Sequence, residues 1–157
     1  MMKIIADSSA NISALEGVCF QSIPMTIRAG EREFVDDGTL DTAKMLDYLA
    51  SYNGKSGTSC PGLDAWLQAF SGADEIFVVT ITGALSGTCA SAVAARDLYL
   101  QSHPEAKIHV FDSLSTGPEM LLLIEKLADL IREGKSFDEI CNCLLYTSPS
   151  PRDGLLS

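Results

Sequence analysis

The sequence has no long hydrophobic run and few basic residues. The longest apolar stretch in its carboxyl-terminal half, Met120–Ile124, is far too short to cross a bilayer, and Met1–Asp7 becomes polar too soon for a signal peptide. Only 11 Lys and Arg residues stand against 21 Asp and Glu residues, which gives a formal net charge of -10. Such a chain does not concentrate nucleic acid phosphates around itself. We therefore expect neither membrane insertion nor a nucleic acid partner.

Cysteine pairs with metal-ligand spacing are also missing. The five cysteines, an odd number, include no CxxC pair, and Cys141 and Cys143 have no histidine nearby in the sequence. We expect no metal and no cofactor. Free thiols in a reducing cytoplasm are favoured over a structural disulfide, because disulfides are rare in that compartment.

Strands that alternate with helices are the main structural signal. Lys3–Ala6 and Lys107–Asp112 have the pattern of short buried strands, and Glu75–Ile81 is a continuous apolar run rich in β-branched residues. Helices are predicted over Ser86–Ser102 and from Pro118 to a C-cap at Gly134. The pattern predicts an α/β fold with a mainly parallel sheet flanked by helices. In such sheets, ligands bind beyond the carboxyl ends of the strands.

Two turns rich in hydroxyl groups are the main functional signal, at Gly57–Gly62 and Thr82–Thr88. Each is expected to stand where a helix begins, and free backbone N–H groups and small hydroxyls at such a place suit an anionic headgroup. Neither turn contains a charged residue, so recognition there would depend on hydrogen bonds. The candidate ligand-binding residues are Thr58, Ser59, Ser86, Gly87 and Thr88.

Each of these hydroxyl residues also has a purely structural interpretation. Ser86 is placed to be the N-cap of a helix that runs from Gly87, a role compatible with ligand binding. Thr58 and Ser59 could likewise cap the helix that carries Trp66. Asp7 and Asp112, at strand ends, are expected to hold neighbouring turns by accepting backbone hydrogen bonds.

Catalytic signatures are weak. A serine hydrolase or acyltransferase that uses Ser86 as its nucleophile is an alternative, but it needs an oriented base, and neither His103 nor His109 is well placed. The Thr82–Thr88 turn lacks the lysine of a phosphate-binding loop and the spacing of a dinucleotide fingerprint. Cys60 could be reactive near a helix N-terminus, yet no partner cysteine or base stands beside it. We expect a protein that binds rather than an enzyme.

The chain from Cys143 onward departs from the pattern of the rest. The helix opened by a capping box at Ser136 is expected to end almost as soon as it starts. Residues 143–157 resemble a translated sequencing adapter, and a proline-rich surface terminus is the alternative. We therefore divide the chain into a domain at residues 1–142 and a non-native tail at residues 143–157.

Six short motifs follow one another in an order that matches a known family. They are Asp7–Ser9, Ile23–Met25, Phe34–Asp37, Thr58–Pro61, Ile81–Thr88 and Asp112–Gly117. Together they cover nearly everything up to Ile140 and resemble the amino-terminal domain of the DegV family, bacterial fatty-acid-binding proteins. Three positions depart from the family pattern, which commonly has a glutamine at Cys60 and serines at Gly62 and Gly83.

The resemblance implies a cytoplasmic lipid carrier that holds a long-chain fatty acid between two domains. Hydroxyls of the two turns would hold the carboxylate, here best matched by Thr58 or Ser59 and by Ser86. Some members of the family present the fatty acid to a fatty acid kinase that makes an acyl phosphate for phospholipid synthesis. Such members also use basic residues of a second domain, which leaves a nonfunctional truncated fragment as a further possibility.

Overall fold

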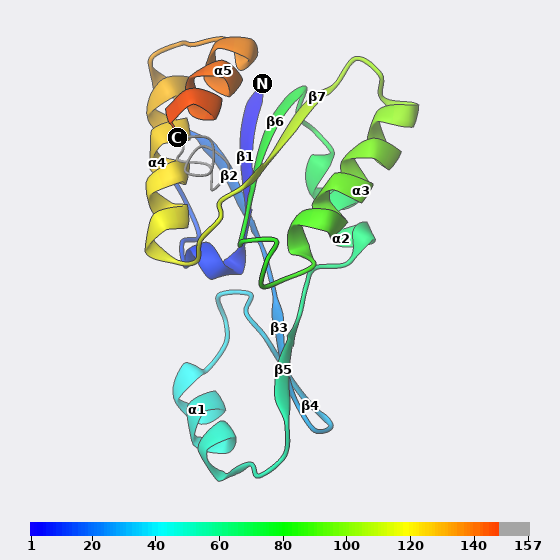
Figure 1. Ribbon diagram of the computed structural model, residues 1–157, viewed down its shortest axis with the longest axis vertical. Coiled ribbons are helices and arrows are strands. Elements are labelled where there is room, and N and C mark those ends of the chain that lie inside the picture. The colour runs from blue at the N-terminus through cyan, green and yellow to red at the C-terminus, as the bar shows by residue number, and fades with distance from the viewer. Residues whose placement is uncertain (148–157) are drawn as a thin grey trace, which may run out of the picture.

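The structure is a computed structural model that describes residues 1–147 (Figure 1). Its main body is a four-stranded sheet in the order β2-β1-β6-β7, and every neighbouring pair of strands is parallel. The strands are β1 (Met2–Asp7), β2 (Cys19–Ile23), β6 (Glu75–Thr80) and β7 (Lys107–Asp112). The predicted α/β fold with a mainly parallel sheet flanked by helices is confirmed.

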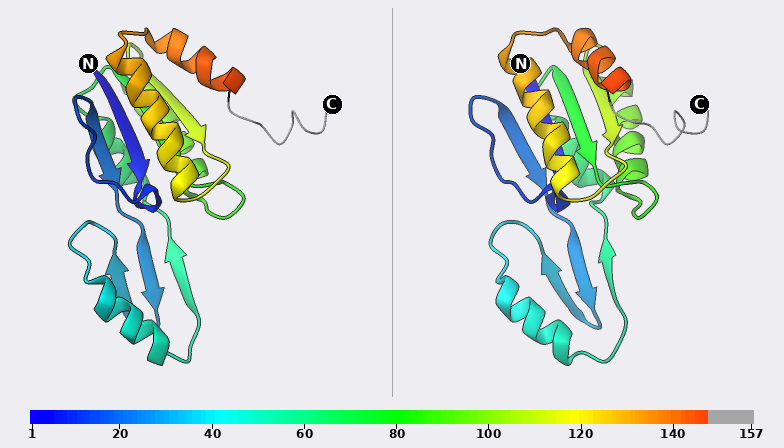
Figure 2. Two further views of the ribbon diagram at one scale, coloured as in Figure 1. Left: turned by 90° about the vertical axis from the view of Figure 1, so that its left-hand side faces the viewer. Right: turned by 60° about the vertical axis from the view of Figure 1, so that its left-hand side comes forward.

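Two helices cover each face of this sheet. One face carries α2 (Leu63–Phe70) and α3 (Thr88–Ser102), and the other carries α4 (Pro118–Arg132) and α5 (Phe137–Thr147), as Figures 1 and 2 show. Alternation along the strands feeds both cores, because successive side chains point to opposite faces. In β1, Ile4 packs with the α4 and α5 side chains, whereas Ile5 packs with those of α2 and α3.

The apolar run of the central strand β6 is explained by its burial on both faces. Ile76 and Val78 are fully buried with Trp66 and Phe70 of α2, while Phe77 and Val79 are fully buried on the other face. A strand covered on both faces has no position that faces water, so its sequence is continuously apolar. The sequence prediction for this strand is confirmed.

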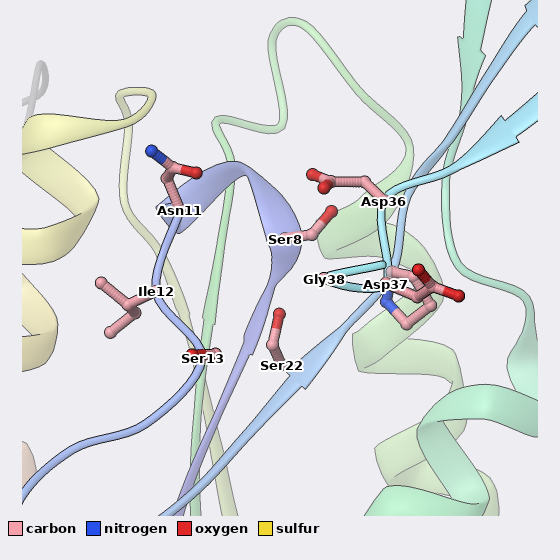
Figure 3. A pocket seen from close by; sticks show the side chains of 9 residues that line it. Ser8, Asn11, Ile12, Ser13, Ser22, Asp36, Asp37 and Gly38 are labelled. Carbon is pink, nitrogen blue, oxygen red and sulfur yellow. The ribbon is translucent and has the colours of Figure 1, made fainter. Parts of the chain in front are cut away.

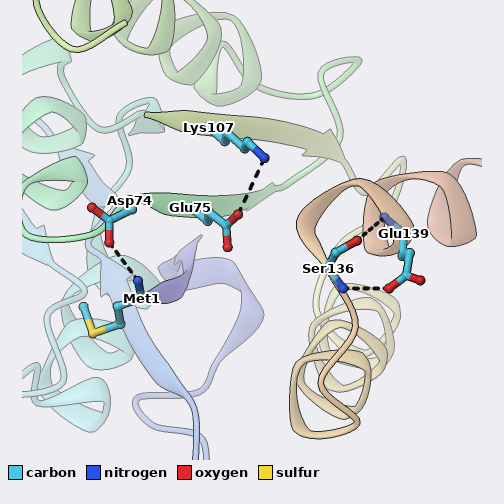
Figure 4. Close-up of polar contacts among 6 residues, drawn as sticks. All are labelled: Met1, Asp74, Glu75, Lys107, Ser136 and Glu139. Atoms are coloured by element: carbon cyan, nitrogen blue, oxygen red, sulfur yellow. Dashed lines mark hydrogen bonds and ion pairs between the residues drawn. The ribbon is translucent and has the colours of Figure 1, made fainter. Parts of the chain in front are cut away.

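Helices α4 and α5 begin and end at the residues that favour such boundaries. Pro118 opens α4, and Gly134 follows its end with a φ of +76°, a left-handed conformation suited to glycine. At the start of α5, the Ser136 N–H donates to Glu139 Oε2 at 2.8 Å and the Glu139 N–H donates to Ser136 Oγ at 3.2 Å (Figure 4). This is the predicted capping box.

The expectation that this last helix stops early is wrong. α5 continues to Thr147, and Leu144 is buried in the same core cluster as Ile140, one helical turn earlier. Apolar residues four apart keep one face of a helix against the core. Residues 148–157 of the predicted tail lie outside the described residues, and the assignment of residues 143–157 as non-native stays a prediction.

A second, smaller sheet extends beyond the carboxyl ends of the main strands (Figures 1 and 2). It is antiparallel, in the order β4-β3-β5, and helix α1 connects β4 to β5 along the chain. Its elements are β3 (Thr26–Ala29), β4 (Arg32–Val35), α1 (Thr42–Ser51) and β5 (Ser56–Ser59). The Tyr48 ring of α1 makes a tilted contact with Phe34 of β4 and stacks on Tyr52, which follows α1, so this small unit has its own packing.

The opposite end of the main sheet carries ion pairs. The amino group of Met1 lies 2.8 Å from Asp74 Oδ2, and Lys107 Nζ lies 3.8 Å from Glu75 Oε1 (Figure 4). Within residues 1–147, no helix combines the length and the apolar character that a membrane crossing requires.

Candidate ligand-binding site

The carboxyl ends of β1, β6 and β7 meet at one edge of the main sheet, facing the small sheet (Figure 1). A short 3-10 turn, η1 (Ser8–Ala10), follows β1, and the loop 81–87 follows β6. A third loop, 113–117, follows β7. This edge is where parallel α/β sheets place their ligands.

Asp7 ties the first two of these segments together. Its side chain is fully buried, and its Oδ2 accepts a hydrogen bond from the Ile81 N–H at 2.7 Å. Its Oδ1 accepts from the N–H of Ser9 at 3.0 Å and from the hydroxyl of the same serine. The predicted role of Asp7 in holding neighbouring turns is confirmed.

Asp112 does the same for the second and third segments. Its Oδ2 accepts from the Gly83 N–H at 3.0 Å, and its Oδ1 accepts from the Leu114 N–H at 2.9 Å. Asp112 thereby links the loop after β6 to the loop after β7, and its predicted structural role is confirmed. Both oxygens are occupied by backbone donors, which leaves this carboxylate poorly suited to act as a base.

Ser86 and Thr88 form a local hydrogen-bonded pair at the start of α3. Ser86 Oγ accepts from the Thr88 N–H at 3.2 Å and lies 2.7 Å from Thr88 Oγ1. The N-cap itself is Gly87, one residue later than the predicted cap, so Ser86 stands just before the cap position. Its hydroxyl nevertheless satisfies the first free N–H of the helix. Thr88 is fully buried, whereas Ser86 is half-buried.

Thr58 and Ser59 do not lie in a turn before a helix, as the sequence suggested. They are the last two residues of β5, which pairs with β3 through Ile27↔Thr58 and Thr26↔Ser59. Their proposed capping of α2 is wrong, because the N-cap of that helix is Gly62 and receives no side-chain hydrogen bond. Successive strand residues point to opposite faces, so the two hydroxyls face different sides of the small sheet.

The two hydroxyl-bearing segments nevertheless meet. Cys60 Sγ lies 3.7 Å from the point that a Cβ on Gly87 would occupy, and Ser91 Oγ donates to the Pro61 carbonyl at 3.0 Å. The end of β5 therefore lies against the first turn of α3. The two segments that carry the predicted residues are therefore adjacent in the fold, although the local structure of the first segment differs from the prediction.

No described histidine supports a nucleophilic Ser86. His103 stacks on Tyr99 with ring centroids 4.1 Å apart, at the far end of α3, and burial lowers the pKa of His109, which stands within β7. Within residues 1–147, neither ring is hydrogen-bonded to Ser86. The Cys89 thiol, near the same helix start, has its pKa raised, chiefly by burial. The described residues also contain no group of three or more metal-ligating side chains.

These features define an α/β domain whose sheet edge carries two hydroxyl-bearing segments without charged residues, suited to binding. A family model described as "Uncharacterised protein, DegV family" matches residues 1–150. The chain belongs to the DegV family.

This chain spans about half the length of the relatives that it matches. A DegV domain-containing protein of Streptococcus pneumoniae is 46% identical over 146 residues, which cover 90% of this chain and 52% of the relative. A DegV family protein of Eubacterium eligens, solved loaded with heptadecanoic acid, is 51% identical with a TM-score of 0.90, over 92% of this chain and 52% of that one. The Streptococcus pneumoniae Fatty Acid Kinase B3 protein, solved loaded with linoleic acid, is 44% identical with a TM-score of 0.89, over 94% and 54%.

Proposed function

We propose that this chain binds a long-chain fatty acid, with the carboxylate held where the end of β5 meets the first turn of α3. The approach of Cys60 to Gly87 carries this proposal, because it brings the residue after Ser59 against the residue after Ser86. Two solved relatives, at 51% and 44% identity, are described as loaded with heptadecanoic and linoleic acid. Their likeness supports the same class of ligand here.

Thr88 supports Ser86 rather than touching the ligand. It is fully buried, and both its N–H and its hydroxyl can donate to Ser86 Oγ. With two donors directed at its oxygen, Ser86 has its own proton left to donate to a carboxylate. Backbone N–H groups from Gly87 onward add the partial positive charge of a helix N-terminus.

Either Ser59 or Thr58 of β5 supplies a further hydroxyl donor to the carboxylate. Ser59 is half-buried and directly precedes Cys60, whereas Thr58 is exposed on the opposite face. We retain both as candidates, and single alanine substitutions separate them because only one side chain can face Ser86.

An uncharged headgroup site is sufficient for a lipid ligand. Burial of each CH₂ contributes about 0.8 kcal/mol, so a long acyl chain supplies most of the affinity. Hydrogen bonds then need only to satisfy the carboxylate and orient it. The hydrogen bonds of the site therefore orient the carboxylate, while burial of the acyl chain supplies the affinity.

We further propose that the protein carries its fatty acid to a fatty acid kinase in the cytoplasm and performs no chemistry itself. A kinase-associated relative, the Streptococcus pneumoniae Fatty Acid Kinase B3 protein, supports this role. The lack of an oriented base at Ser86 among residues 1–147 favours a carrier over a hydrolase or acyltransferase.

Native mass spectrometry of the chain after bacterial expression, followed by solvent extraction, tests the proposal. We expect a copurified fatty acid whose amount falls in Ser86→Ala and is kept in Ser102→Ala, a matched change at the far end of α3. Should the chain carry no lipid, the same measurement is made on a hybrid with the carboxyl-terminal half of the Streptococcus pneumoniae relative. Lipid only in the hybrid identifies an incomplete site, and none in either contradicts the proposal.

A further inference from the structure

A cavity of about 380 Å³ lies at the junction of the main and small sheets and contains none of the residues of the proposed headgroup site (Figure 3). Its walls come from η1 with the loop behind it, from β2 with Pro24, and from the loop that follows β4. We name it the Ser8–Asp36 cavity. Its polar lining includes Ser8, Asn11, Ser13, Ser22 and Asp36.

Polar atoms of this cavity lack partners within the protein. In residues 1–147 the side chains of Asn11, Ser22 and Asp36 make no hydrogen bond. Ser8, which is only 8% exposed, accepts from the Met25 N–H at 2.9 Å and retains its hydroxyl proton for another acceptor. Figure 3 shows the side chains of Ser8 and Asp36 pointing toward one another, with Ser22 directed into the same space. Ser22 and Asp36 are half-buried and Asn11 is exposed at the rim, so their polar atoms are available to a hydrogen-bonding occupant.

The charge of the cavity is of one sign. Asp36 and Asp37 are its only ionisable lining residues, and neither takes part in an ion pair of the described chain. The carboxylate of Asp37 accepts two hydrogen bonds from Thr39, which lower its pKa and keep it ionised. A cation is the occupant that neutralises such a wall.

Apolar atoms complete the lining. Ile12 and Pro24 stand among the polar groups and offer contact to a short hydrocarbon stem. A neutral polyol would satisfy the hydroxyls but would leave the half-buried Asp36 without a counter-charge. A guanidinium or ammonium group supplies several donors, a positive charge and an aliphatic stem together.

We propose that the Ser8–Asp36 cavity binds a guanidinium or primary ammonium group carried on a short aliphatic stem. Asp36 neutralises the charge, Ser22 and Asn11 accept its N–H donors, and the stem lies along Ile12 and Pro24. Two sources supply this chemistry, a free alkylamine and an Arg or Lys side chain of another polypeptide segment. The site is separate from the carboxylate site, so its test does not depend on fatty acid binding.

The test is a titration of the ¹⁵N-labelled 157-residue chain with n-butylguanidinium chloride at matched ionic strength, followed by amide chemical shifts. The matched neutral probe is n-butylurea, which has nearly the same shape and no charge. We expect saturable shifts at Ser8, Ser22 and Gly38, and affinity for n-butylurea lower by about fivefold or more, as for a partly exposed ion pair. Equal shifts from both probes would overturn the proposal, as would shifts scattered over the acidic surface.

Two variants locate the charge and the cavity. Asp36→Asn is expected to weaken n-butylguanidinium binding about fivefold, whereas Asp47→Asn, on exposed α1, removes the same charge without effect. Ser13→Leu, at an exposed lining position, narrows the cavity without disturbing the core and is expected to abolish the shifts. Unchanged binding in Asp36→Asn or in Ser13→Leu contradicts the proposal.

The peptide acetyl-Gly-Arg-Gly-amide separates the two sources. Binding of this peptide as tight as that of n-butylguanidinium supports an arginine side chain as the occupant. Binding of the small probe alone supports a free alkylamine of the same chemistry.

Discussion

The carboxylate of Asp112 accepts a 3.0 Å hydrogen bond from the backbone N–H of Gly83, so the end of β7 positions the loop that follows β6. The same carboxylate holds the Leu114 N–H of its own loop. The loop after β6 carries Ser86. Asp112 therefore controls the position of the proposed headgroup donors, although it need not touch the ligand itself.

The variant Asp112→Ala tests this control. It leaves two backbone N–H groups without their acceptor, and we expect a loss of about 1–2 kcal/mol in the free energy of unfolding, measured by urea denaturation. Fatty acid affinity is expected to fall in the same variant, because Ser86 is no longer held in place. Asp97→Ala, which removes an exposed carboxylate paired with Arg96 on α3, serves as the control for both measurements. Unchanged affinity in Asp112→Ala would exclude the positioning role.

Asp7 makes a stronger prediction about stability. Asp7→Asn replaces one of two acceptor oxygens by an NH₂ group that faces the Ile81 or Ser9 N–H in a fully buried place. We expect a decrease of about 3 kcal/mol in the free energy of unfolding, typical of an unsatisfied buried polar group. Asp47→Asn, at an exposed position, is the matched control. A urea midpoint equal to that of the unsubstituted chain would show that these bonds are not needed.

Reactivity should separate the cysteines. Burial, with a smaller contribution from Asp138, raises the pKa of the Cys141 thiol to about 11, whereas Cys19 is exposed. Because the thiolate is the reactive form, alkylation of Cys141 at pH 8 should be much slower than that of Cys19. Mass spectrometry of peptides after timed iodoacetamide labelling measures both rates in one sample. Equal rates would place Cys141 in a more open environment than the structure shows.

The capping box of α5 gives a dependence on pH with a defined sign. Hydrogen bonds from the Ser136 N–H and from its side chain lower the pKa of Glu139 in the folded state. A lowered folded pKa means that stabilisation by Glu139 is full above its unfolded pKa, about 4.3, and is lost as the pH falls through the folded value.

An NMR titration of the Glu139 side chain checks this shift directly. We expect a pKa below the ordinary glutamate value in the unsubstituted chain and a value closer to ordinary in Ser136→Ala. Identical titration of Glu139 in both proteins would contradict the contribution of the Ser136 side chain to its lowered pKa.

The parallel core could be predicted from the sequence because its signal is local. Ile76–Val79 is apolar without interruption, and such a run has few interpretations other than a buried strand. Pro118 and Gly134 mark the limits of α4 in the same local way. Asp7 and Asp112 follow strands directly, so their role at the sheet edge was also predictable.

The strand β5 could not be predicted in this manner. Ser56–Ser59 has neither apolar alternation nor β-branched residues apart from Thr58, and it becomes a strand because β3 pairs with it. Because of that pairing, Thr58 and Ser59 lie at the end of a strand and not at the predicted helix cap. The continuation of α5 was missed for a similar reason, since Leu144 takes its place from contacts with the core.

The most direct test of the headgroup site uses palmitic acid labelled with ¹³C at its carboxyl carbon. Bound to the chain, or to the hybrid with a relative's carboxyl-terminal half, it should give a carboxyl resonance distinct from the free acid, together with amide shifts at Gly87 and Thr88. Ser86→Ala should move that resonance towards the position of the free acid and reduce those shifts, and Ser102→Ala should keep both unchanged. Palmitic acid that binds equally well to Ser86→Ala, with the Gly87 and Thr88 amides unmoved, would contradict the proposed carboxylate site.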